Sequence, residues 1–122
     1  MKLVDTSAWI HQLRSDGDTA VRHRVDALLH GGQACWCPVV RLELWMGARG
    51  DREKAILRQY EQALPELGIS DEVWKEAFAL ARAARAAGLT CPSPDVLIAA
   101  CARHHGLEVE AADHHFPALM AL

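Results

Sequence analysis

Four carboxylates occupy positions where an α/β fold could bring them together. Asp5 follows the apolar pair Leu3–Val4, and Asp113 comes just past the end of the expected last strand, 107–111. Asp95 falls in the first turn of an expected helix, and Glu43 lies inside an otherwise apolar helical segment. Two carboxylates ~4 Å apart repel by about 4 kcal/mol at an effective dielectric near 20, so a cluster of them needs a cation. Mg²⁺ and Mn²⁺ prefer carboxylate and water oxygens, and the four acids therefore predict a site for one or two such ions.

Each of these acids also has a purely structural explanation. Asp5 and the following Thr6 are good helix caps, and Asp113 is equally suited to cap a last helix. Asp95 suits the positive end of its helix, and Glu43 could extend to solvent. Their expected place at one edge of one sheet favours the metal site, because ligands of open parallel sheets bind beyond the carboxyl ends of the strands.

Apolar runs and helical patterns alternate along the chain and predict how the acids are positioned. The expected strands are 3–5, 34–37, 107–111 and a weak one at 65–69. The expected helices are 6–14, a segment ended by Gly31-Gly32, a segment from Pro38 to Gly47, 51–64, 70–88 and 93–106. This order predicts a single α/β domain over 1–122, with a central, mostly parallel sheet of about four to five strands and helices on both faces.

The composition is that of an ordinary globular protein and excludes a strong global attraction to nucleic acid. The chain has 122 residues, 51% of them hydrophobic and 24% charged, and a formal net charge of −3. Contact with nucleic acid would therefore need bound cations or local arginines, most of which we expect on solvated helix faces. The candidate arginines are Arg14, Arg41, Arg49, Arg52, Arg82 and Arg85.

No signal-peptide core or membrane-spanning run is evident, so we expect a cytoplasmic protein without membrane contact. Cys35, Cys37, Cys91 and Cys101 lack the paired spacing of a structural zinc site and are expected as small buried hydrophobes.

Two pairs of histidines and four tryptophans also admit functional interpretations. The doublets His104-His105 and His114-His115 lack the spacing that places ligands on one helical face, so surface histidines are the preferred interpretation over zinc ligands. The tryptophans fall at apolar positions and are expected in the core or at an interface rather than as base-stacking platforms. They are Trp9, Trp36, Trp45 and Trp74.

Four segments together resemble the PIN-domain ribonucleases, in particular the VapC-type toxins of VapBC toxin–antitoxin pairs. The segments are VDTSAWI (4–10), VVRLELWMGAR (39–49), SPDVLIAACARHHGL (93–107) and AADHHF (111–116). They occur in the family order over essentially the whole chain. The helix start Asp-x-Leu-Ile-Ala-Ala and the closing Asp-x-x-Phe are the more specific parts.

The resemblance implies a metal-dependent endoribonuclease and assigns roles to particular residues. It places Asp5, Glu43 and Asp95 as the metal-binding and catalytic acids and Asp113 as a more variable fourth, with Thr6 and Ser7 as supporting hydroxyls. The implied cofactor is Mg²⁺ or Mn²⁺, and the implied products carry 5′-phosphate and 3′-hydroxyl ends.

The resemblance also implies an RNA substrate, a cognate antitoxin and a homodimer. One departure concerns the last acid. Family members often carry Thr or Ser two residues before it, where this chain has Ala111. The missing hydroxyl could have oriented Asp113 or a bound water.

Three other functions compete with the nuclease. A phosphoaspartate-type phosphatase needs a second Asp at position 7, where Ser7 stands, and a receiver-like module needs acids near the first strand and a late lysine. Lys54 and Lys75 lie on polar helix faces and fit that second role poorly. The stronger alternative is a catalytically silent PIN-like module that binds RNA or protein, and a cleavage assay with metal discriminates it from the nuclease.

Overall fold

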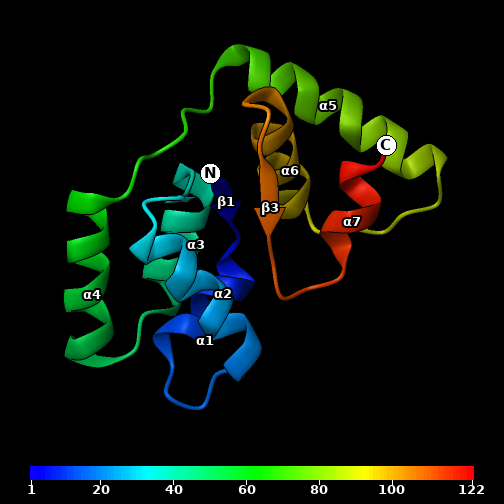
Figure 1. Ribbon diagram of the computed structural model, residues 1–122. Coiled ribbons are helices and arrows are strands. Elements are labelled where there is room, and N and C mark those ends of the chain that lie inside the picture. Colours follow the sequence, from blue (N-terminus) through cyan, green and yellow to red (C-terminus); the bar gives the residue numbers. More distant parts are fainter.

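Three short parallel strands lie at the centre of the molecule in the computed structural model, which describes all 122 residues (Figure 1). They are β1 (Lys2–Val4), β2 (Ala34–Cys35) and β3 (Glu108–Glu110), in the order β2-β1-β3. Leu3 of the central strand lies opposite Val109 of β3.

Seven helices surround this sheet. They are α1 (Thr6–Leu13), α2 (Thr19–His30), α3 (Pro38–Gly47), α4 (Gly50–Ala63), α5 (Asp71–Ala86), α6 (Ser93–His104) and α7 (His115–Met120). Figure 1 shows α4 and α5 at opposite sides of the molecule, with the strands between them. The α/β class and the parallel pairing agree with the prediction from the sequence.

The two crossovers explain why the acids meet. The connection from β1 to β2 and the connection from β2 to β3 run in opposite directions across the sheet. Because parallel crossovers are right-handed, opposite directions place their helices on opposite faces. A crevice then opens beyond the carboxyl ends of neighbouring strands, here β1 and β3, at the place where ligands of such sheets bind.

The expected number of strands was wrong. The sheet has three strands, and the segment 65–69 forms only one isolated bridge, between Trp36 and Glu66. Leu67 N–H donates to the Trp36 carbonyl at 2.8 Å, and Trp36 N–H donates to the Pro65 carbonyl at 3.2 Å. Pro65 has no N–H to continue the ladder, and Gly68 has no side chain to pack, so the pairing ends there.

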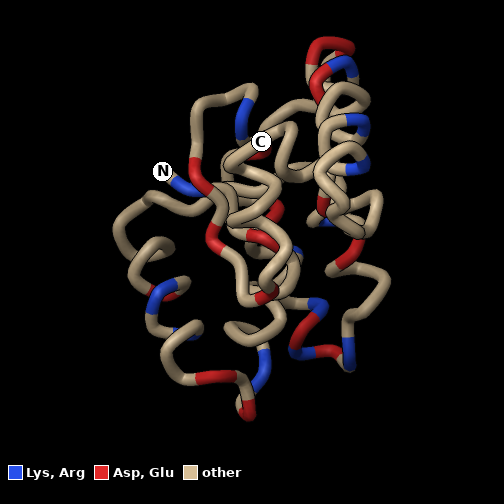
Figure 2. Tube along the Cα trace, turned by 90° about the vertical axis from the view of Figure 1, so that its right-hand side faces the viewer, with Lys and Arg blue, Asp and Glu red and all other residues tan.

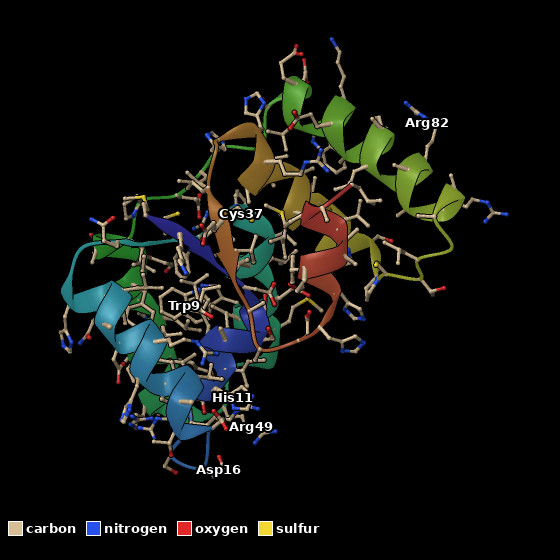
Figure 3. The ribbon with its side chains drawn as sticks, turned by 45° about the vertical axis from the view of Figure 1, so that its right-hand side comes forward. Trp9, His11, Asp16, Cys37, Arg49 and Arg82 are labelled. Atoms are coloured by element: carbon tan, nitrogen blue, oxygen red, sulfur yellow. The ribbon has the colours of Figure 1, made fainter.

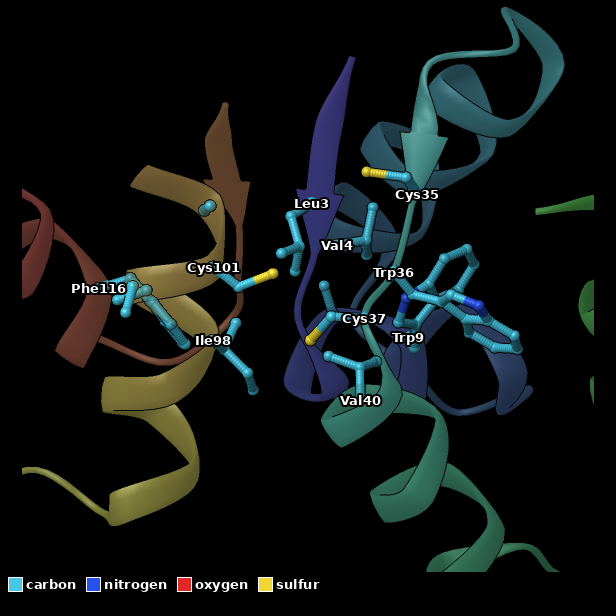
Figure 4. Close-up of a cluster of buried hydrophobic side chains, with 14 of the residues drawn as sticks. Leu3, Val4, Trp9, Cys35, Trp36, Cys37, Val40, Ile98, Cys101 and Phe116 are labelled. Carbon is cyan, nitrogen blue, oxygen red and sulfur yellow. The ribbon is translucent and has the colours of Figure 1, made fainter. Parts of the chain in front are cut away.

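The core forms between the sheet and helices from both crossovers. Figure 4 shows Ile98 and Cys101 of α6 on one side of β1 and the Trp9 and Trp36 rings on the other. Trp9 and Trp36 are fully buried, with ring centroids 6.3 Å apart in an edge-on arrangement. The interpretation of these two tryptophans as core residues is confirmed.

The cysteines are buried largely as expected, whereas one tryptophan is not. Cys35, Cys37 and Cys101 are buried and free, and Cys91 is half-buried. The side chain of Trp74 is 43% exposed.

None of the helices has the length and apolar character needed to cross a membrane.

Candidate metal centre

Asp5 lies directly at the carboxyl end of β1 and serves as the N-cap of α1. Its Oδ2 accepts a hydrogen bond from Ser7 N–H at 3.1 Å and from Ser7 Oγ at 2.6 Å. Its own N–H donates to the Glu110 carbonyl of β3 at 2.8 Å, which fixes it against the neighbouring strand. Asp5 is only 2% exposed. Capping and a place in a site are therefore compatible roles for this one residue.

The Ser7 hydroxyl ties the end of β1 to the loop that follows β3. While it donates to Asp5, its Oγ accepts from Ala112 N–H at 3.0 Å and from Asp113 N–H at 3.3 Å. One hydroxyl thus holds segments more than 100 residues apart in the sequence. Ala111 provides no hydroxyl here, and Ser7 orients the backbone of Asp113 instead.

Asp95, Asp113 and His115 form a compact cluster whose ligand atoms all lie within 4.8 Å of one another. His115 Nδ1 lies 2.7 Å from Asp95 Oδ2 and 3.6 Å from Asp113 Oδ1. His115 N–H also donates to Asp113 Oδ1 at 3.0 Å. Pro94 near the start of α6 fixes the first turn that presents Asp95, because proline suits this part of a helix.

Glu43 reaches the same edge from α3. Its Oε1 accepts a hydrogen bond of 2.7 Å from Thr6 Oγ1, and Thr6 is the residue that follows Asp5. Glu43 and Asp5 both lie outside the cluster of Asp95, Asp113 and His115. The structure thus places two hydroxyls in separate roles, with Thr6 on Glu43 and Ser7 on Asp5.

The electrostatics of the site are those of crowded acids. Burial, with a smaller contribution from the charges of Asp113 and Asp95, raises the pKa of Asp5 to about 6 against the opposing hydrogen bonds from Ser7. Burial and the charge of Asp113 also raise the pKa of Asp95, while the hydrogen bond from His115 opposes them. None of the three aspartates forms an ion pair with Lys or Arg. Their mutual repulsion is therefore left for a bound cation to offset.

Two residues of this region were not expected from the sequence. His115 was interpreted as a surface histidine, yet 26% of its side chain is exposed and its ring contacts Asp95. No local spacing reveals a contact between residues twenty apart on different helices. The interpretation holds for His104, His105 and His114, which are exposed.

Glu110 is the second unexpected residue. It is a buried acid at the end of β3, and Arg24 of α2 lies 3.2 Å from its Oε2. This ion pair spans 86 residues of sequence, so nothing near Glu110 in the sequence indicates it. The pairing makes Glu110 a structural acid and sets it apart from the aspartates.

The basic residues do not gather into one patch. Figure 2 shows Lys and Arg interspersed with Asp and Glu along the trace, and Figure 3 shows Arg82 and Arg49 at opposite ends of the view. The Arg41 guanidinium forms ion pairs with Glu61 and Glu66, at nitrogen–oxygen distances of 3.1 and 2.7 Å. A solvated or ion-paired role fits these side chains better than a continuous phosphate-binding surface.

Sequence comparisons place this chain in a known family. The PIN domain family matches residues 2–121 of the chain. The chain is 34% identical over 119 residues to VapC ribonuclease Mb1587 of Mycobacterium bovis, a match that covers 95% of this chain and 89% of that protein. It is 33% identical over 106 residues to ribonuclease VapC21 of Mycobacterium tuberculosis, covering 84% and 77% of the two chains.

Comparison with solved structures agrees on the fold. FitAcB from Neisseria gonorrhoeae superposes with a TM-score of 0.75 at 21% identity, covering 98% of this chain and 94% of that one. VapBC-5 from Mycobacterium tuberculosis, described as a member of the VapBC family of toxin-antitoxin systems, superposes with a TM-score of 0.71 at 22% identity, over 97% and 89%. With a family match over nearly its whole length and VapC relatives above 30% identity, this chain belongs to the PIN domain family, among the VapC-type proteins.

Proposed function

We propose that this protein is a Mg²⁺- or Mn²⁺-dependent endoribonuclease and the toxin component of a type II toxin–antitoxin system. The observation that carries the proposal is the buried Asp5 carboxylate, which faces the charges of Asp95 and Asp113 with no basic partner. The relatives named as VapC ribonucleases support the reaction class. RNA is the substrate that this class implies.

The donor set fits a hard divalent cation. Asp5, Asp95 and Asp113 would hold it through carboxylate oxygens, with Glu43 at the same edge as a further ligand, direct or through water. When bound, such a cation supplies an activated water and stabilises charge on the phosphoryl oxygens. The oxygen-rich chemistry of the cluster argues against a structural zinc site, which uses Cys and His.

The other residues of the site have positioning roles in this proposal. The Ser7 hydroxyl bonds both the Asp5 carboxylate and the Asp113 backbone, and Thr6, the residue after Asp5, bonds the Glu43 carboxylate. Both contacts restrict the rotation of the carboxylates that they hold. Hydrolysis at this site leaves a 5′-phosphate and a 3′-hydroxyl, since water adds to phosphorus and the 3′-oxygen departs with a proton.

An RNA cleavage assay tests the function directly. We expect the purified protein to cut RNA with Mn²⁺ or Mg²⁺, to stop with chelator, and to lose cleavage in Asp95→Asn. Asp71→Asn is the matched control, because Asp71 is an exposed acid in the first turn of another helix, as Asp95 is in α6. Absence of metal-dependent cleavage by the wild type would support the silent PIN-like module instead, and equal cleavage by wild type and Asp95→Asn would contradict the assignment of Asp95 to the site.

An apolar groove beside the site supports the proposed homodimer. It is a cavity of about 850 Å³ between α5, α6 and the start of α3, and Trp74 and Phe78 line it while 43% and 56% exposed. Exposed apolar surface of this kind marks a partner site. Figure 2 shows acidic residues at one end of α5 and basic residues toward the other. Two copies of α5 packed antiparallel across a two-fold axis would therefore match opposite charges around an apolar centre.

The oligomeric state tests this part of the proposal separately. We expect a dimer in sedimentation velocity at micromolar concentration and a monomer for Phe78→Glu. Phe78 is exposed, so the substitution disturbs the folded core little. A monomeric wild type would remove the homodimer without affecting the nuclease.

The proposed antitoxin partner rests on the structural neighbours, which are VapBC and FitAB assemblies. Co-expression tests it. Induction of this chain alone should stop growth of a bacterial host, and Asp95→Asn should relieve the arrest. The protein encoded beside this chain should co-purify with it.

A further inference from the structure

The candidate metal centre contains one nitrogen donor, His115, among its carboxylates. The side chain enters the site from the first turn of α7, and its backbone N–H is fixed by the 3.0 Å hydrogen bond to Asp113 Oδ1. Phe116, the next residue, is 2% exposed and holds the start of this helix against the core. The backbone of His115 is therefore fixed by its own hydrogen bond and by the buried side chain of the next residue.

The Nδ1 atom of His115 lies where a ligand of this centre would lie. Its hydrogen bond to Asp95 in the metal-free protein would be replaced by coordination, with the ring proton on Nε2. Nδ1 lies 2.7 Å from Asp95 Oδ2 and 3.6 Å from Asp113 Oδ1. Adjacent ligands of an octahedral ion with bonds of about 2.1 Å lie roughly 3 Å apart, so these separations suit three ligands of one ion. The backbone hydrogen bond uses one lone pair of Asp113 Oδ1 and leaves another free.

The chemistry of a mixed oxygen and nitrogen site differs from that of an all-carboxylate site. Mg²⁺ strongly prefers oxygen and gains little from an imidazole nitrogen. First-row transition ions accept such nitrogen readily, and their affinity for N/O sites rises from Mn²⁺ onward along the series. A histidine among the aspartates therefore changes which ion is bound, beyond adding one more contact.

We propose that His115 is a direct metal ligand that shifts the preference of this centre from Mg²⁺ toward Mn²⁺. The inference rests on the proposed function, because it requires that the acids bind a divalent cation. It adds the identity of the preferred ion and a ligand outside the four carboxylates. His114, one residue earlier and exposed, has no such contact and provides the control position.

Spectroscopy of the bound Mn²⁺ ion tests the proposal without any measurement of activity. Mn²⁺ is added to the full-length protein, and pulsed electron paramagnetic resonance detects nitrogen coupled to the ion. We expect ¹⁴N modulation in the wild type and in His114→Asp, and its loss in His115→Asp. Calorimetric titrations with Mn²⁺ and Mg²⁺ should show the ratio of the two affinities falling at least tenfold in His115→Asp and unchanged in His114→Asp.

The outcomes separate this inference from the proposed function. Binding of Mn²⁺ by the wild type without nitrogen coupling would overturn the role of His115 and leave the carboxylate site intact. An unchanged affinity ratio in His115→Asp would do the same. If the wild type bound neither ion, both the proposed function and this inference would fail. Absence of nitrogen coupling in the wild-type spectrum would overturn the proposal even if His115→Asp folds poorly.

Discussion

Asp5 and Glu110 are two buried acids on neighbouring strands with opposite electrostatic surroundings. They are 2% and 9% exposed, and the Asp5 N–H donates to the Glu110 carbonyl. Glu110 has Arg24 at 3.2 Å. Asp5 instead faces the carboxylates of Asp95 and Asp113, and its pKa is raised to about 6, mainly by burial.

The difference shows which acid the fold neutralises by itself. A buried charge destabilises a protein unless it is paired, and the ion pair with Arg24 meets that need for Glu110. The charge of Asp5 is left unpaired, which is the arrangement expected of a ligand site. Substitution of Asp5 should therefore lower activity and raise the stability of the metal-free protein, whereas loss of the Arg24–Glu110 pair should lower stability.

The largest expected difference is in RNA cleavage. Asp5→Asn should lower the rate by about 1000-fold, because it removes a charged ligand at the reacting centre. Glu110→Gln should stay within a few-fold of wild type, since Glu110 holds structure only. Initial rates on one RNA substrate with saturating Mn²⁺ measure both variants. Equal losses of cleavage rate in the two variants would contradict the distinction between a ligand acid and a structural acid.

The stability of the metal-free protein should change in the opposite sense. Asp5 keeps its proton up to about pH 6 when folded but releases it near pH 3.8 when unfolded, so the stability of wild type falls as the pH rises through this window. Asp5→Asn removes the titration and still caps α1. At pH 7.5 the variant should exceed wild type by up to about 3 kcal/mol, and the gap should close near pH 4. Urea unfolding with chelator at several pH values measures it; a less stable variant at pH 7.5 would contradict the account.

Removal of the basic partner of Glu110 should destabilise the fold. Arg24→Met leaves a buried carboxylate without its cation and should cost about 2 kcal/mol, below the range for fully buried pairs because Arg24 is half-exposed. Arg22→Met is the control, since Arg22 contacts only the Ser15 carbonyl at the surface. Chemical denaturation gives the free energy of unfolding of both variants. Equal values would show that the fold does not depend on the pairing of Glu110 with Arg24.

The smallest expected effect concerns the Ser7 hydroxyl. Ser7→Ala removes the link between Asp5 and the Asp113 backbone and should reduce cleavage about tenfold, the lower end for residues that orient ligands. Ser15→Ala, in an exposed turn, should leave the rate unchanged. A wild-type rate in Ser7→Ala would mean that the loop after β3 is held by other contacts.

The sequence reveals most of what is local in this molecule. The caps, the glycine stops and the apolar patterns predict nearly every helix, and the position of Asp5 after β1 and of Asp95 at the start of α6 follows from them. The segment 65–69 shows the limit, because a short apolar pattern does not say whether enough backbone pairs form to make a strand.

These local patterns do not predict contacts between segments that are distant in the sequence. The ring of His115 on Asp95, the ion pair of Arg24 with Glu110 and the bridging hydroxyl of Ser7 all join residues on different elements. Such contacts depend on how crossovers return to the sheet, and no spacing in the sequence encodes them. The resemblance to VapC-type toxins indicated the acids but not the histidine.

Calorimetric titration of Mn²⁺ into the metal-free protein at pH 7.5 tests the central distinction most directly. The account predicts that wild type and Glu110→Gln bind the ion with similar affinity and that Asp5→Asn binds it at least tenfold more weakly. Equal affinity in all three proteins would show that the unpaired carboxylate of Asp5 does not hold a cation.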